Sequence, residues 1–193
     1  MRRWITTLAV AAGAAVSGLI APTTAHAAPY CGIYWGSLEK SAGTTSTPRW
    51  PIEDVRAGRH ACFDRLVLDF AGHPSAYRVR YVPAVTQQGS GAVLPLRGGS
   101  YLQVEVLSTI YDVTTGSPTY RPANPDELVD VTGWRTFRQV ALGGSFEGHT
   151  TIGLRVRARL PLRVFTLEAP GRPRDRRGPP LVSQGPGGSH PSG

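Results

Sequence analysis

Residues 154–160 read Leu-Arg-Val-Arg-Ala-Arg-Leu, and this strict alternation constrains the fold more than any other feature of the chain. Successive side chains of a β-strand point to opposite faces of the sheet. We therefore predict that the apolar residues of this run line a core and that its arginines share the outward face. The core residues are then Leu154, Val156, Ala158 and Leu160, and the outward residues Arg155, Arg157 and Arg159.

Other short segments alternate in the same way and are separated by glycine and proline, whereas no window keeps the i, i+3, i+4 stripe of a helix. Short strands at this spacing are typical of a sandwich or barrel. The predicted strands are 62–70, 76–85, 101–107, 135–142, 151–160 and 162–167. Residues 112–130 are the longest predicted loop, with room for one helical turn at 125–128. The predicted fold class is all-β, a single β-sandwich domain with a disordered C-terminal tail.

Residues 1–27 have the features of a secretory signal peptide. Two arginines precede an apolar run at 4–20, and Ala25 and Ala27 provide a small-x-small cleavage site before Ala28. A membrane anchor is the weaker interpretation because the run is short and interrupted by glycine and serine. A lipoprotein anchored at Cys31 is weaker still, because the preceding residues are not small. We predict a secreted protein, extracellular or cell-wall associated, with no membrane span after cleavage.

Export determines how the two cysteines are interpreted. In an oxidising exterior Cys31 and Cys62 have only each other as partners, so one disulfide is predicted. It would close a loop of about 30 residues and remove roughly 3 to 4 kcal/mol of denatured-state freedom. A pair of unbonded, buried thiols is the alternative.

The formal net charge of +8 is concentrated at the two ends of the chain. Removing the two leader arginines, and the net three positive charges after Gly171, leaves +3 for the folded part. This mild charge suits anionic wall polymers but is below what a nucleic-acid binder needs. No nucleic-acid partner is predicted.

Motifs for catalysis and metal binding are incomplete. Gly143 to Glu147 fails the last position of a nucleophile elbow, so Ser145 and His149 are a weak basis for a serine hydrolase. The histidines lack metal-ligand spacing, and no phosphate loop or dinucleotide fingerprint occurs. A glycosidase pair among Asp64, Asp69, Glu105 and Glu147 is not excluded, but no motif supports it. We predict no enzyme activity, no cofactor and no metal.

Arginine next to tyrosine is the best candidate for ligand binding, because guanidiniums bind carboxylates and aromatic rings stack on sugar faces. Arg78 and Arg80 lie between Tyr77 and Tyr81, and the 154–160 run repeats the theme. The alternative is a solvated sheet face balanced by Asp64, Asp69 and Glu105. The candidate binding residues are Arg78, Arg80, Tyr81, Arg155, Arg157 and Arg159.

Four segments of the chain also form a recognisable series. They read GRHACFDRLV at 58–67, YRVRYV at 77–82, GSFEG at 144–148 and LRVF at 162–165. In this order they resemble the AMIN-like domain of secreted actinobacterial proteins, over roughly Cys31 to Pro170. The related AMIN domain of cell-wall amidases and secretins is a noncatalytic β-sandwich that targets proteins to peptidoglycan. The resemblance implies envelope localisation and glycan binding, and it assigns no functional residues.

The chain departs from this resemblance after Pro170. AMIN-like domains usually close with an apolar strand ending in a Val-Asp-Val-like run, whereas residues 171–180 read GRPRDRRGPP. Because proline and unpaired charge do not fit a core strand, we predict a disordered tail at 171–193. One set of codons for Arg-Pro-Arg-Asp-Arg-Arg-Gly-Pro reads Ala-Arg-Ala-Ile-Val-Val-Asp one base later. We hypothesise that a frameshift replaced the closing strand.

Three functions are consistent with these features. The leading one is a secreted, noncatalytic cell-envelope module at 28–170 that binds peptidoglycan or associated wall polymers. A secreted hydrolase of wall glycans would be favoured by paired carboxylates in a cleft, and a protein-interaction or inhibitor domain by a large exposed apolar patch.

The frameshift hypothesis makes a prediction about the protein and one about its gene. Restoring the shifted frame from Arg172 should raise the melting temperature of the protein and reduce its aggregation, because a closing strand would cover an unpaired sheet edge. Sequencing the gene provides the first check. Codons that cannot yield Ile-Val-Val-Asp in either alternative frame would refute the hypothesis.

Overall fold

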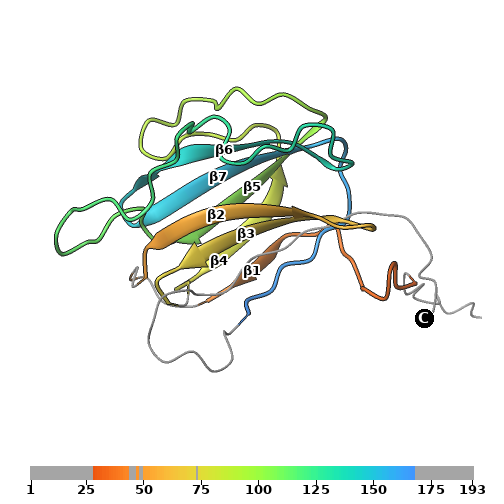
Figure 1. Ribbon diagram of the computed structural model, residues 1–193, viewed down its shortest axis with the longest axis horizontal. Coiled ribbons are helices and arrows are strands. Elements are labelled where there is room, and N and C mark those ends of the chain that lie inside the picture. The colour runs from red at the N-terminus through yellow and green to blue at the C-terminus, as the bar shows by residue number, and fades with distance from the viewer. Residues whose placement is uncertain (1–27, 44–46, 48–49, 73, 168–193) are drawn as a thin grey trace, which may run out of the picture.

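The computed structural model describes residues 28–43, 47, 50–72 and 74–167 (Figure 1). The predictions for the leader at 1–27 and for the tail at 171–193 lie outside the described residues. Within the described part, the regular secondary structure consists of strands alone. These are β1 Lys40–Ala42, β2 Ile52–Arg59, β3 Asp64–Phe70, β4 Tyr77–Val82, β5 Ser100–Leu107, β6 Phe137–Phe146 and β7 His149–Val156.

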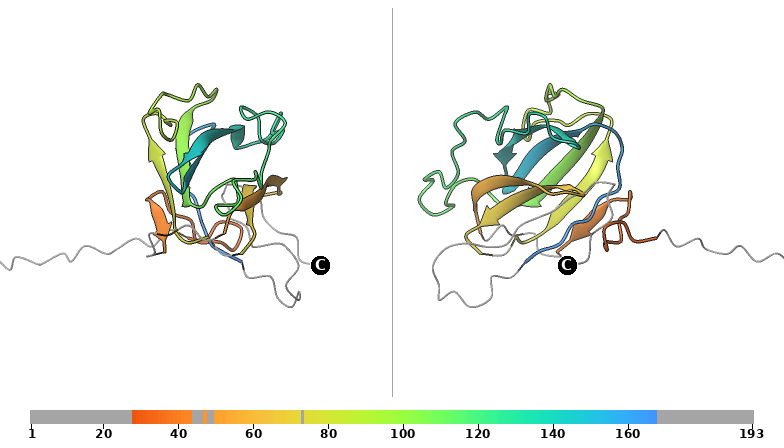
Figure 2. Two further views of the ribbon diagram at one scale, coloured as in Figure 1. Left: turned by 90° about the vertical axis from the view of Figure 1, so that its left-hand side faces the viewer. Right: turned by 45° about the vertical axis from the view of Figure 1, so that its right-hand side comes forward.

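The strands form two antiparallel sheets, so the predicted all-β class is confirmed. One sheet has five strands in the order β1-β4-β5-β7-β6, and the other is the β2–β3 hairpin. The hairpin lies across one face of the five-stranded sheet (Figures 1 and 2). The large sheet therefore has an inner face toward the hairpin and an outer face away from it.

The predicted strands at 62–70, 76–85 and 101–107 are confirmed, with small changes at their ends, as β3, β4 and β5. β6 begins and ends later than predicted. The strand at 162–167 is wrong, because only Leu162 forms a bridge, to Gly36. β2 was not predicted, since a bulge between Ile52 and Asp54 breaks its period of two. The helical turn predicted at 125–128 is present only as a single hydrogen-bonded turn, in which Glu127 N–H donates to Asn124 O. Leu128 N–H donates to Val140 O of β6.

The strand predicted at 151–160 ends earlier, and this corrects the predicted faces. β7 stops at Val156, so Ala158 is exposed and Leu160 is only half-buried. The neighbouring strands β5 and β6 begin at Ser100 and Phe137, which pair with that same Val156. Beyond it no strand is left to pair with. Sequence alternation therefore predicted the face of each residue but not the length of the strand.

The main core fills the space between the hairpin and the inner face of the large sheet. Alternate residues of every strand except the edge strand β1 enter it, which is the arrangement of a sandwich. Its largest fully buried side chains include Phe70 from β3 and Phe137 from β6. The other strand residues in this core are Ile52, Val55, Leu66, Leu68, Val79, Leu102, Val104, Val106, Val140, Ile152, Leu154 and Val156.

One buried carboxylate connects the two sheets. Asp64, at the start of β3, is 1% exposed. Its Oδ2 accepts hydrogen bonds from the backbone N–H of Thr136, at 2.7 Å, and of Phe137, at 3.1 Å. Both donors lie at the start of β6. The carboxylate therefore fixes one end of the hairpin against the far edge of the large sheet.

A disulfide anchors the segment before β1. Cys31 and Cys62 are bonded, with their Cα atoms 6.4 Å apart, so the predicted pairing is confirmed. Cys62 lies in the turn between β2 and β3. In the chain-entropy model a loop of this length stabilises the fold by roughly 3 to 4 kcal/mol. The disulfide therefore also holds the turn that precedes Asp64.

We expect Asp64→Ala to lower the free energy of unfolding by about 2 to 4 kcal/mol, because two buried N–H groups lose a charged acceptor. Asp64→Asn is the matched control. Its amide oxygen can accept both bonds, so its loss should be clearly smaller. Urea denaturation of the three proteins measures the difference. Equal stability of Asp64→Ala and the parent would contradict this role.

Candidate functional site

The outer face of the five-stranded sheet is divided into two halves. One half is apolar and is covered by the chain between β4 and β5, whose Val85, Leu94 and Leu96 pack on Ala141. Gly153 of β7 permits this approach, since a Cβ there would lie 2.7 Å from a methyl carbon of Leu96. The covering segment therefore lies over the part of the face where the sheet has the small residues Ala141 and Gly153.

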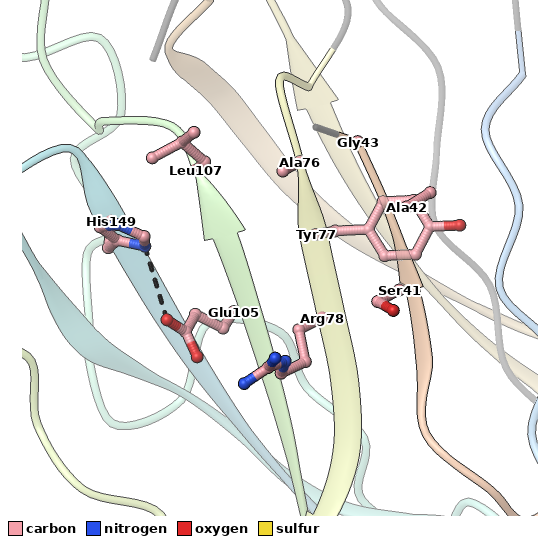
Figure 3. A pocket seen from close by; sticks show the side chains of 9 residues that line it. All are labelled: Ser41, Ala42, Gly43, Ala76, Tyr77, Arg78, Glu105, Leu107 and His149. Carbon is pink, nitrogen blue, oxygen red and sulfur yellow. Dashed lines mark ion pairs between the residues drawn. The ribbon is translucent and has the colours of Figure 1, made fainter. Parts of the chain in front are cut away.

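The other half of the outer face is polar and open. It contains a cleft of about 390 Å³, within the usual range for a small-ligand site. Figure 3 shows the cleft between β1, β4, β5 and the start of β7. The lining residues are Ser41, Ala42, Gly43, Ala76, Tyr77, Arg78, Glu105, Leu107 and His149.

The cleft contains both a base and an acid. His149 Nδ1 lies 3.4 Å from Glu105 Oε1, and both side chains are partly exposed. Arg78 is opposite Glu105 in the β4–β5 register, and both side chains line the cleft (Figure 3). Arg78 Nε also lies 3.2 Å from Glu39 Oε1, so this guanidinium forms an ion pair next to the cleft. The site therefore presents the guanidinium of Arg78, the carboxylate of Glu105 and the imidazole of His149 on one face of the sheet.

Of the predicted binding residues, Arg78 and Arg80 share the outward face of β4. Arg78 is exposed and lines the cleft. Arg80 is half-buried, and its Nε has no hydrogen-bond partner among the described residues. Gln103, its partner on β5, is buried beside it. These two arginines therefore remain candidates on one surface.

Tyr81 lies on the opposite side of β4, toward the core. Its hydroxyl donates to Leu160 O at 2.7 Å and accepts from Leu160 N–H at 2.9 Å. Burial raises the pKa of this phenol. Both hydrogen-bonding directions of the hydroxyl are occupied, so Tyr81 fixes the chain that follows β7.

The three arginines of the 154–160 run do not share one face, which corrects the prediction. Arg155 lies on the outer face, where its guanidinium covers the Tyr101 ring at 3.4 Å and donates to Gly98 O. Arg157 lies beyond the strand and lines a separate cleft. Arg159 lies over the Tyr81 ring at 5.0 Å. The early end of β7 separates them.

Residues considered for catalysis have other partners. Ser145 Oγ accepts a hydrogen bond from Thr150, while His149 pairs with Glu105. Asp64, at the start of β3, is buried and bonded to the start of β6, and Asp69 binds Arg56 across the hairpin at 2.5 and 2.8 Å. The side chains of Asp64, Asp69 and Glu105 therefore lie in three separate environments. Glu147 occupies the turn between β6 and β7, with a φ of 48°.

No three His, Cys, Asp or Glu side chains in the described part of the chain gather into a group that could hold a metal ion. In the same residues, no helix has the length and apolar character required to cross a bilayer.

The sequence indicated Arg78 but not its surroundings. From the sequence, Glu105 is expected only to balance the positive charge of the arginines, and His149 only to act as a base for Ser145. The alternation of residues 101–107 could have placed Glu105 on the same face as Arg78, had the pairing of β4 with β5 been known. Ser41 and Ala42 carry no such signal, because β1 has only three residues.

These features define a small disulfide-linked β-sandwich with an open polar cleft on the outer face of its larger sheet. The model of the AMIN-like domain family matches residues 50–174. The chain therefore belongs to the AMIN-like domain family. The match begins after Cys31, which the resemblance had included, and ends four residues beyond Pro170. Comparisons with curated proteins and with solved structures gave no match.

Family membership gives a coarse function. AMIN-like domains are associated with the cell envelope and are generally noncatalytic binding modules. Membership of this family suggests a cell-wall-related binding module.

We expect Tyr81→Phe to lower the free energy of unfolding by about 1 to 2 kcal/mol, because Leu160 loses both of its hydrogen bonds. Tyr34→Phe is the matched control, since Tyr34 is 72% exposed and should be neutral. Urea denaturation measures both. An unchanged stability for Tyr81→Phe, combined with weaker retention on cell walls, would instead favour a ligand contact.

Proposed function

We propose that the protein is exported and binds peptidoglycan through the polar cleft on the outer face of its large sheet. The observation that carries the proposal is the exposed Arg78 in this cleft, on a domain of an envelope-associated family. The disulfide is consistent with an oxidising exterior. The domain at 28–170 would be the binding unit.

The chemistry of the cleft suits the two parts of peptidoglycan. Its stem peptides carry carboxylates, which a guanidinium such as that of Arg78 can bind in a bidentate manner. Its glycan strands carry hydroxyl and amide groups, which can both donate and accept hydrogen bonds. Glu105 accepts and His149 can donate, so the pair complements such groups.

The shape of the site also supports binding to a polymer. The cleft is bounded by the edge strand β1 and opens on a sheet face, so a polymer could continue beyond the bound unit on the side that the described residues leave open. The volume of about 390 Å³ suits one or two units rather than a long segment. Affinity per site should be modest, and attachment to the wall would be strengthened by repeated binding.

We expect Arg78→Gln to reduce retention of the purified protein on cell-wall sacculi by about five- to tenfold, the loss for one charge-assisted contact. Glu105→Gln should weaken retention less, because its amide still accepts a hydrogen bond. Arg121→Gln is the matched control. It removes one exposed arginine that lines neither cleft and should leave retention unchanged.

The same assay separates the alternatives. Sacculi stripped by acid of phosphodiester-linked polymers should still retain the protein if peptidoglycan is the ligand, and Arg78→Gln should still weaken that retention. An equal loss in Arg78→Gln and Arg121→Gln would mean that net charge alone drives retention. Steady release of soluble fragments from sacculi would point to a hydrolase instead. Either result would overturn the proposal.

A further inference from the structure

Three arginines converge on a second cleft at the other end of β7. Arg135 and Arg138 flank Thr136 at the start of β6, and Arg157 follows the end of β7. The cleft they line has a volume of about 220 Å³. At about 3.3 Å per strand residue, the chain from His149 to Arg157 separates it from the first cleft by about 25 Å. The two clefts are therefore distinct.

The positive charge of this second cleft is not neutralised within the described part of the chain. Asp64 is the one acidic residue lining it there, and it is buried with Oδ2 already bonded to two backbone N–H groups. None of the three arginines forms an ion pair with a described carboxylate, whereas Arg56, Arg78 and Arg97 each do. A cleft with three guanidiniums and one buried carboxylate attracts anions.

Two of the guanidiniums are held in place without losing charge. Arg135 Nη1 donates to Ala61 O at 2.8 Å, in the turn that carries Cys62. Arg138 Nη1 donates to Trp134 O at 2.6 Å and Phe137 O at 2.9 Å, and its Nη2 donates to Arg135 O at 3.4 Å. Carbonyl acceptors fix the direction of a guanidinium, and its remaining N–H groups stay available for a ligand. This part of the cleft is therefore preorganised.

The third guanidinium, of Arg157, is free to close on a ligand. Arg157 is exposed, and its side chain has no hydrogen-bond or ion-pair partner among the described residues. Its backbone is fixed, because its N–H donates to Thr136 O at 2.9 Å. The side chain thus extends from a rigid point beside two oriented arginines.

We propose that this second cleft binds an oxyanion carried by a cell-wall polymer, with Arg135, Arg138 and Arg157 as its ligands. A phosphoryl group is the expected form, because its several oxygens can meet three donors that converge from different elements. A carboxylate is the other source of the same chemistry. This site shares no residue with the first cleft. The proposal of an oxyanion site therefore does not depend on the proposal that the first cleft binds peptidoglycan.

The experiment is an NMR titration of the purified full chain with inorganic phosphate, with acetate and with chloride, at constant ionic strength. The expected result is a saturable shift of the backbone amide signals of Cys62, Asp64 and Thr136. The signals of Glu105 and His149, in the first cleft, should not follow. Saturation by phosphate identifies a phosphoryl ligand, and tighter saturation by acetate identifies a carboxylate. Shifts no larger than those caused by chloride would overturn the proposal.

Variants test the three arginines. Arg157→Gln should weaken phosphate binding by about tenfold, the loss of one charge-assisted contact. Because Arg157 is exposed, the variant should fold as the parent does. Unchanged amide signals away from the second cleft would verify the fold. Arg121→Gln, with the same change of net charge, should bind phosphate as the parent does. Equal weakening by both variants, or none by Arg157→Gln, would refute the site.

Failure of this site and failure of the proposed function are distinguishable. Arg157→Gln should leave retention on acid-stripped sacculi unchanged, because those walls lack phosphodiester polymers. Arg78→Gln should leave phosphate binding unchanged. If Arg78→Gln abolished phosphate binding at Thr136, the two clefts would form one site and the proposal of a second site would be wrong.

Discussion

The packing of the β2–β3 hairpin on the inner face of the large sheet is the interaction on which the rest of the structure depends. The hairpin covers the apolar side of four strands, and Phe70 and Phe137 are fully buried where the layers meet. Apolar burial has no direction, so it does not by itself fix how the two layers are placed. Asp64 does, because its bonds to the start of β6 have one geometry. Burial and one directed polar contact together set the sandwich.

Because one face of the large sheet is used by the core, the outer face is available for function. The segment between β4 and β5 covers the half of that face around Gly153 and leaves the half around Arg78 open. Arg155 is part of this cover, since it lies on Tyr101 and binds Gly98 O. An arginine on an outer face can thus be structural or available, and only its neighbours distinguish the two roles.

The two clefts differ in chemistry, and this difference fits a domain that attaches to a mixed polymer surface. The first combines Arg78 with Glu105 and His149, so it can exchange hydrogen bonds with neutral groups as well as bind a carboxylate. The second is cationic through Arg135, Arg138 and Arg157. Contacts at both ends of β7 would allow an extended ligand to bind at two points, with a gain in effective affinity over either alone.

The sequence by itself determined the strand content, the disulfide partners and the face of most strand residues. A period of two fixes which way each side chain of a strand points, and two cysteines allow a single pairing. The tertiary structure decided where β7 ends, because strand length depends on the ends of β5 and β6. It also decided which residues meet. Arg78, Glu105 and His149 come from three strands, and Arg157 joins Arg135 across β6 and β7. Such sites depend on sheet order and register, which arise from contacts between segments distant in the chain.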